Sequence, residues 1–172
     1  MPPQGCFSVM LGEASPQYPR NSEGDVVALR DGRLLACWTR FYGGAEDDAR
    51  AEIAARLSGD GGRTWGAPFV LQENVGTQNV MSASFLRERE SGALLFFYGV
   101  KNSVSDMRFY CWRSNDEGES WDEPVLVTPG EAYFVINNAR IVQLRSGRLL
   151  APTGYCQEVW TAGEHFRTVM FY

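Results

Sequence analysis

A loop in the first third of the sequence is rich in side chains that can do chemistry. Glu46, Asp47 and Asp48 are three adjacent carboxylates, and they follow the glycine pair Gly43 and Gly44. The glycines give the backbone enough freedom to fold such a loop over a pocket. The sequence of three neighbouring carboxylates does not say which one would face that pocket. This depends on the strands that position the loop.

The cysteines and the single histidine do not have the spacing of a metal site. Cys6, Cys37, Cys111 and Cys156 lie far apart without a C-x-x-C pair, and His165 is the only histidine. Neither a zinc site nor a dense disulfide framework is indicated. Three of the cysteines sit in apolar runs, where a free thiol behaves as a small hydrophobic side chain. We expect reduced thiols, no metal and no organic cofactor.

The composition is that of an ordinary globular chain with an acidic balance. The 172 residues are 44% hydrophobic and 22% charged, with a formal net charge of -5. A nucleic-acid partner is not expected, because proteins that bind the phosphate backbone usually present a basic face. The N-terminal stretch lacks the basic start and apolar run of a signal peptide, and no later stretch approaches the roughly 18 to 20 apolar residues of a membrane span. We therefore expect no membrane insertion and, by default, a cytoplasmic location.

An eight-residue box of the form S-x-D-x-G-x-[ST]-W occurs twice, 56 residues apart. Its aspartate can accept backbone N–H bonds across a turn, its glycine adopts a conformation that other residues resist, and its tryptophan can bury a large apolar face. We therefore interpret the box as a structural hairpin without a chemical role. Its key residues are Ser58, Asp60, Gly62 and Trp65 in the first copy and Ser114, Asp116, Gly118 and Trp121 in the second.

A second repeat shares the period of the box. It reads VVALRDGRLLA at residues 26–36 and IVQLRSGRLLA at residues 141–151, with a looser copy, FLRERESGALL, at residues 85–95. Asp31-Gly32 and Ser146-Gly147 suit tight hairpin turns. The runs around the first copy have the composition of short strands. The strands predicted for this first unit span residues 25–30, 34–41, 52–57 and 68–72.

Four strands that recur with a repeated box are typical of a β-propeller blade, and a β-sandwich would not explain the box. The boxes resemble the Asp-boxes, or bacterial neuraminidase repeats, of the sialidase superfamily, and the resemblance runs from about Tyr18 onward. Stretches such as YFVINNARIVQLRSGRLLAP resemble a bacterial exo-α-sialidase-like subgroup. The resemblance implies an all-β, six-bladed propeller.

About three blades fit in residues 1–172, at about residues 20–75, 78–130 and 133–172, the last of them incomplete. Known propellers use about four to eight blades, so three cannot close a ring. We expect an N-terminal fragment whose ring is completed by further blades of the same chain or by a second copy. A third box is expected to begin near position 170, so residues 168–172 are expected to be the apolar strand that precedes it and the box itself to be cut off.

In the sialidase superfamily, which this sequence resembles, an arginine cluster binds the sugar carboxylate. A tyrosine activated by a glutamate attacks the anomeric carbon, and an aspartate is the acid and base for the leaving group. By resemblance Arg20, in YPRNSEGD just before the first predicted strand, is part of the clamp, although Pro19 and Asn21 depart from the family motif. The resemblance also places the acid/base aspartate in the loop before the first box, where Asp47 is expected to take this role, with Asp48 as the alternative. Glu46 is expected to be solvated.

The same resemblance gives further substrate contacts and two functions. Loop positions that resemble pocket-facing ones also include Met81 and Lys101, for which core packing and a surface role are the simpler interpretations, and His165 is expected at the surface. One function is a retaining exo-glycosidase that removes a terminal acidic sugar such as sialic acid, inactive as this chain alone because its nucleophile lies beyond Tyr172. The alternative is a non-catalytic Asp-box propeller that binds glycans or proteins. The further substrate-binding residues expected are Glu23, Arg40, Asn138 and Arg140.

Overall fold

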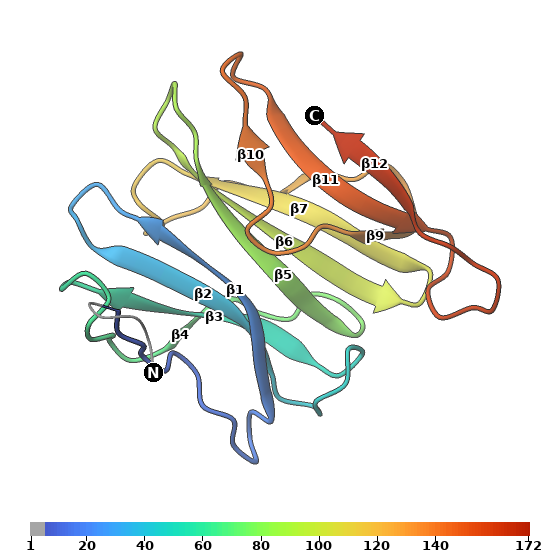
Figure 1. Ribbon diagram of the computed structural model, residues 1–172, viewed down its shortest axis with the longest axis horizontal. Helices are drawn as coiled ribbons and strands as arrows, with labels where there is room; N and C mark the ends of the chain where they lie inside the picture. Colours follow the sequence, from blue (N-terminus) through green and yellow to red (C-terminus); the bar gives the residue numbers. More distant parts are fainter. Residues whose placement is uncertain (1–5) are drawn as a thin grey trace.

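The computed structural model describes residues 6–172, and these form twelve β-strands and no helix (Figure 1). Residues 1–5, the start of the stretch assessed for a signal peptide, lie outside the described residues. None of the residues from 6 onward forms a helix that could cross a bilayer. The strands are β1 (Arg20–Ala28), β2 (Leu34–Phe41), β3 (Ala51–Ser58), β4 (Phe69–Gln72), β5 (Asn79–Arg87), β6 (Leu94–Ser103), β7 (Asp106–Ser114), β8 (Val125–Leu126), β9 (Tyr133–Val135), β10 (Val142–Gln143), β11 (Leu149–Cys156) and β12 (Arg167–Phe171).

The strands form three antiparallel units, and Figure 1 shows the second between the other two. The first unit is the sheet β1-β2-β3-β4, and the second unit comprises β5, β6, β7 and β8. In the third unit β11 pairs with β9, β10 and β12. A single parallel pair, Met107 with Tyr133, joins the second and third units into one eight-stranded sheet. This curled all-β arrangement is that of a β-propeller.

The first strand of each unit is interrupted. The pairing register shifts between Ser22 and Asp25 in β1 and between Met81 and Ser84 in β5, while β9 and β10 are two pieces separated by residues 136–141. Glu23 in the first shift has a φ of 57°. Such bulges bend a strand and redirect a side chain, and they are common beside active sites.

Side chains tie the interrupted strands to one another. The backbone N–H of Phe85 donates to Asp25 Oδ2 at 2.8 Å, and Asn138 Nδ2 donates to the carbonyl of Gly24 at 2.9 Å. Burial raises the pKa of the Asp25 carboxyl group above its ordinary value, and the hydrogen bond from the Phe85 backbone opposes the shift. The first strands of the three units therefore converge.

Two apolar cores lie between neighbouring units. The core between the first and second units is centred on Phe96, whose ring lies 5.3 Å from Tyr98 and 5.8 Å from Trp121. The core between the second and third units contains Phe97 and Phe134. Alternate residues of β6 thus face opposite neighbours, because successive side chains of a strand point to opposite faces.

Both boxes close their hairpins with the same hydrogen bonds. In the first box the N–H of Thr64 donates to Asp60 Oδ1 at 2.8 Å, and the N–H of Gly62 donates to Ser58 Oγ at 2.9 Å. These bonds lower the pKa of the exposed Asp60 carboxyl group to about 2. The second box repeats the arrangement, and Asp116 has the same low pKa of about 2.

Some strand bounds differ from the sequence prediction. The observed β2 spans the 34–41 predicted, whereas β1 begins at Arg20, five residues earlier than position 25. Arg20 is therefore inside a strand, where it pairs with Phe41, and not just before one. The reason is that β1 continues its pairing with β2 through the bulge. Residues 167–171 form β12, which is the apolar strand expected ahead of the third box.

The outermost strand of each unit is short. In the part of the chain that the structure describes, β4 pairs with β3, β8 with β7, and β12 with β11. The hydrophobic side chains of Phe69, Val70, Val125, Leu126 and Met170 on these strands are exposed.

Candidate functional site

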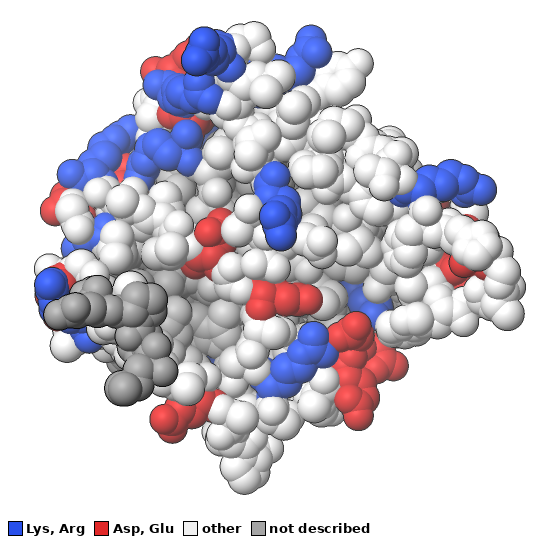
Figure 2. Space-filling view, viewed as in Figure 1, with Lys and Arg blue, Asp and Glu red and all other residues white. Residues whose placement is uncertain are grey.

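A cavity of about 260 Å³ opens where the interrupted strands meet the loop that follows β2. Glu23, Asp47 and Ser82 give it polar walls, and Trp160 and Phe166 give it exposed aromatic ones. The face in Figure 2 carries acidic and basic side chains intermixed near its centre and not a patch of one sign. The net charge of -5 therefore does not describe the local field at this face.

Arg20 and Asp47 meet at the rim of the cavity although they are 27 positions apart. Arg20 Nη1 donates to Asp47 Oδ1 at 2.5 Å and to the carbonyl of Ala45 at 3.2 Å. The guanidinium carbon also lies 4.4 Å from the centre of the Phe41 ring. Asp47 keeps a 52% exposed side chain in this pair, so it is held by one arginine and still accessible from solvent.

Glu23 lies in the wall of the cavity, at the bulge of β1. Burial raises the pKa of its carboxyl group, while Arg20 and a hydrogen bond from Thr39 partly oppose the shift. The Thr39 hydroxyl donates to Glu23 Oε2 at 3.2 Å. A carboxyl group with a raised pKa can hold a proton and donate it in a hydrogen bond.

Two buried side chains hold the loop from below. Asn79 Nδ2 donates to the carbonyls of Asp47 at 2.8 Å and Ala49 at 2.9 Å. Lys101 Nζ donates to the same Asp47 carbonyl at 3.1 Å. Burial lowers the pKa of Lys101, and the neighbouring carboxylates oppose that shift. The backbone at Asp47 is thus the best anchored point of the loop.

Tyr133 contributes to the opposite wall, beside Trp160 and Met81. Burial raises the pKa of the Tyr133 phenol to about 12, and the nearby Asp47 and Glu23 charges act in the same direction. Tyr133 is therefore a hydrogen-bond donor in this cavity and a poor nucleophile at neutral pH.

The structure brings only part of the predicted set to this cavity. Glu23, Asp47 and Met81 line it, and Arg20 reaches it through its bond to Asp47. Asp48 is exposed and does not line it. Exposed positions outside the lining of the cavity are occupied by Glu46, Arg140 and His165.

Arg40 and Asn138 have other partners. Arg40 Nη2 donates to Glu52 at 2.6 Å, and its guanidinium lies 4.3 Å from the Tyr18 ring. Its neighbour Thr39 points toward Glu23, so Arg40 projects from the opposite face of β2. Asn138 donates to Gly24, as described above, and its neighbour Asn137 lines the cavity in its place.

Several functional side chains escaped the sequence analysis. Asn79 and Tyr133 were given no role, although Tyr133 is the first residue of the stretch YFVINNARIVQLRSGRLLAP, and Trp160 lies in a segment without a repeat. The surface role expected for Lys101 is wrong, because its side chain is fully buried. A signal for this existed in the sequence, since Lys101 ends the apolar run LLFFYGV, and a charge within a buried strand needs a partner.

Residues 6–172 hold no group of three or more His, Cys, Asp and Glu side chains arranged for a metal ion. The cysteines are free thiols, with Cys6 exposed and Cys37 and Cys156 buried. Burial raises the pKa of Cys111 to about 12. The Cys37, Cys111 and Cys156 thiols therefore lack the environment of a reactive cysteine.

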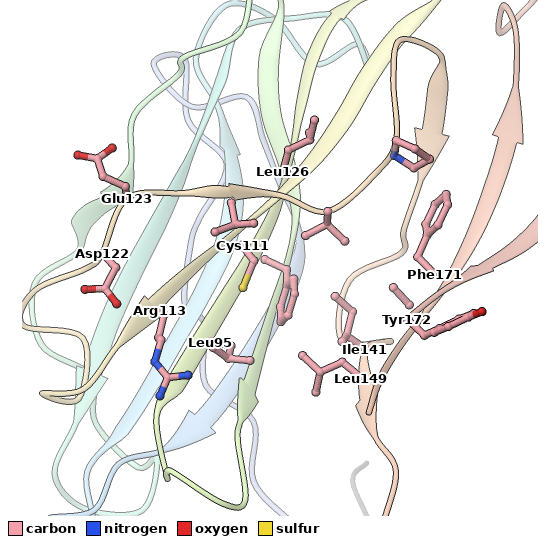
Figure 3. A pocket seen from close by; sticks show the side chains of 15 residues that line it. Leu95, Cys111, Arg113, Asp122, Glu123, Leu126, Ile141, Leu149, Phe171 and Tyr172 are labelled. Atoms are coloured by element: carbon pink, nitrogen blue, oxygen red, sulfur yellow. The ribbon is translucent and has the colours of Figure 1, made fainter. Parts of the chain in front are cut away.

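A larger cavity, about 620 Å³, lies between the second and third units (Figure 3). Its walls are aliphatic and aromatic, with Ile141, Leu149 and Phe171 at one end. The charged Arg113 and Asp122 lie at the other end in Figure 3. Without convergent polar groups in its apolar part, this cavity is less suited to a sugar than the smaller one.

The comparisons with known proteins point to sialidases. A sialidase of Paraclostridium sordellii is 29% identical over 117 residues, which cover 60% of this chain and 29% of that protein. A protein of unknown function from Dyadobacter fermentans has the same fold, with a TM-score of 0.73 and 14% identity over 91% of this chain and 52% of its own. A NanB sialidase variant of Streptococcus pneumoniae gives a TM-score of 0.65 and 12% identity over 94% of this chain and 46% of its own.

The chain thus spans about a third to a half of the lengths of these relatives. The family description that matches is that of a BNR repeat-like domain, over residues 22–172. Since that match covers most of the sequence, the chain belongs to the BNR repeat-like domain family and, with it, to the sialidase superfamily.

Proposed function

We propose that the complete protein is an exo-glycosidase of the sialidase type, which removes a terminal acidic sugar. Asp47 is its acid/base residue and Arg20 is one arm of its carboxylate clamp. The observation that carries this proposal is the meeting of Arg20 and Asp47, 2.5 Å apart, at the rim of a cavity with polar and aromatic walls.

The pair has a direct use in the reaction. An anionic sugar brings a carboxylate that competes with Asp47 for Arg20, because arginine binds carboxylates through charge-assisted hydrogen bonds. Once released, the Asp47 carboxylate can take up a proton from solvent and pass it to the leaving-group oxygen. The carboxylate that this leaves can then accept a proton from the water that attacks next. Glu23, with its raised pKa, is suited to donate a hydrogen bond to a sugar hydroxyl.

The remaining groups must come from elsewhere in the ring. Tyr133, with a pKa of about 12, is no nucleophile, so we assign nucleophile and remaining arginines to further blades or a second copy. Residues 20–75, 78–130 and 133–172 are then the first three blades. The 172-residue chain alone is expected to be inactive.

The test is turnover of a fluorogenic sialoside by the full-length protein. Asp47→Asn and Arg20→Ala should each lose at least about a hundredfold in kcat/KM, the scale of a lost acid/base group. Asp48→Asn is the matched control, since Asp48 neighbours Asp47 but does not line the cavity, and it should stay within about twofold of wild type. A greater loss with Asp48→Asn than with Asp47→Asn would move the acid/base role to Asp48.

A second function, glycan binding without hydrolysis, is favoured by the two exposed aromatic side chains beside the cavity, Trp160 at 64% and Phe166 at 51%. Aromatic faces of this kind offer apolar contact area to a ligand with polar edges. If wild type does not turn over the sialoside but binds it in calorimetry, and Trp160→Ala removes the heat of binding, this second function replaces the first.

A further inference from the structure

Lys101 is the most unusual charged side chain near the site. It lies in β6 between the second and third units and is 0% exposed. A buried ammonium group is costly unless it is paired and hydrogen-bonded. Lys101 Nζ donates 3.1 Å to the backbone carbonyl of Asp47, and it lies 4.5 Å from the ring centre of Trp160 and 5.5 Å from that of Tyr133.

The acceptor of this bond is the significant feature. Lys101 does not bind the Asp47 carboxylate but the peptide oxygen of the same residue, which also accepts from Asn79 at 2.8 Å. Two donors from the second unit therefore fix one peptide group of a loop that belongs to the first unit. The Asp47 side chain keeps its freedom to bind Arg20 or a substrate.

The surrounding charges favour the protonated lysine. Asp47, Asp48 and Glu23 all lie close enough to oppose the effect of burial on its pKa, while Arg20 adds to that effect. An exposed lysine could not fix the loop as firmly, because its flexible chain would lose more rotamer freedom for one bond. The aromatic rings of Tyr133 and Trp160 confine the ammonium group and add a cation–π attraction.

We propose that Lys101 is a positioning residue for the reaction: together with Asn79 it holds the Asp47 peptide so that the acid/base carboxylate stands at the rim of the cavity. This inference rests on the proposed glycosidase function. Lys101 acts through Asp47 and touches no reacting atom, so it is not a catalytic residue. A misplacement of about 1 Å in a reacting group can reduce the rate a hundredfold. An anchor that prevents such a misplacement can therefore outweigh the cost of burying the ammonium group of Lys101.

The test is the kinetics of Lys101→Met in the full-length protein, since methionine fills similar space without donating. We expect kcat to fall at least tenfold while KM stays within twofold. The unfolding midpoint should not fall in proportion, because replacing a buried charge by an apolar group is often neutral or stabilising. Asn102→Ala, the next residue on β6 and without a contact to Asp47, is the control and should keep wild-type kcat. An unchanged kcat in Lys101→Met would overturn the proposal, as would a loss that merely follows a lower unfolding midpoint.

A double-mutant cycle sharpens the result. Because Lys101 and Asn79 donate to one oxygen, Lys101→Met with Asn79→Ala should lose less than the product of the two single losses. Independent, multiplicative losses would contradict a shared anchor.

Amide hydrogen exchange separates this proposal from the proposed function. If the wild-type protein has no sialidase activity, the function fails, but the anchor can still be measured in residues 46–50. Faster exchange there in Lys101→Met, without faster exchange in β6, supports the anchor; unchanged exchange refutes it.

Discussion

Acidic side chains in two regions of this molecule are held in opposite ways. In the boxes, Asp60 and Asp116 are exposed but accept several hydrogen bonds within their own turn, and their pKa values fall to about 2. At the cavity, Glu23 is half-buried and its pKa is raised by burial. Asp47 there bonds an arginine that comes from 27 positions away.

This difference separates carboxylates whose many local hydrogen bonds hold a turn from those whose few or distant partners leave them, under the proposed function, available for chemistry. The box satisfies its aspartate within eight residues, so its geometry survives in any blade. The cavity forms only when the three units pack together, so Glu23 and Asp47 gain their neighbours only in the assembled fold. Substitutions in the two regions should therefore separate stability from activity.

The largest effect expected is a crossover between Asp47 and Asp116. Asp47→Asn should lose at least about a hundredfold in sialoside turnover with little change in stability, because an exposed ion pair contributes at most about 1 kcal/mol. Asp116→Asn should keep wild-type turnover and unfold at lower denaturant. Parallel turnover and urea-unfolding measurements on both variants check this. Equal losses of turnover in the two variants would erase the distinction.

Two tryptophans extend the comparison to packing. Trp121 of the second box lies 5.8 Å from Phe96 and 5.9 Å from Trp112, whereas Trp160 at the cavity is 64% exposed. Trp121→Ala should cost about 3 kcal/mol of unfolding free energy, near the lower end of values for buried aromatics. Trp160→Ala should change it by less than about 1 kcal/mol. Urea denaturation with matched m-values decides, and a costlier Trp160→Ala would assign Trp160 to the core.

Smaller effects should appear in the pH dependence, with opposite signs. The folded-state pKa of Glu23 is above its ordinary 4.5, so its contribution to stability is present below that value and is lost as pH rises through the raised pKa. Glu23→Gln should therefore be more stable than wild type at pH 7, and the gain should vanish toward pH 4. Thermal unfolding at a series of pH values measures it. A variant less stable than wild type at pH 7 would show that burial of the ionised Glu23 carboxylate does not destabilise the fold.

The box aspartates should give the reverse slope. A pKa lowered from 3.8 to about 2 adds stability above the ordinary value, which is lost as pH falls from about 4 to about 2. Asp116→Asn should flatten the acid side of the stability profile relative to wild type. The same thermal series tests this, and identical acid limbs would mean that the box bonds persist in the unfolded chain.

The repeats made most of the fold predictable. The box and its hairpin are local, and the glycine turns Gly32 and Gly147, both with a φ of 89°, follow from sequence alone. The bulge that brings Arg20 into β1 was not predictable, since RNSEG has little strand propensity and pairs only because β2 extends alongside it.

The candidate site was predictable only in part, because its contacts are long-range. A resemblance identified Arg20 and Asp47, but nothing in the sequence indicates that Lys101 reaches a carbonyl 54 positions away. Arg40 illustrates the converse. It lies within β2 and not after it, and the alternation of side chains along the strand directs it toward Glu52 and away from the cavity.

The outer strands of the three units carry a consequence for handling the protein in solution. A strand edge with free N–H and C=O groups is a template for pairing with another molecule, and short length or a flanking proline limits that pairing. Pro68 precedes β4 and Pro124 precedes β8, whereas no proline precedes β12, which begins with Arg167 and Thr168. In samples of the 172-residue chain by itself, strand addition from a second molecule should therefore start at β12, and aggregation should be slowed most by a proline or lysine placed at Met170.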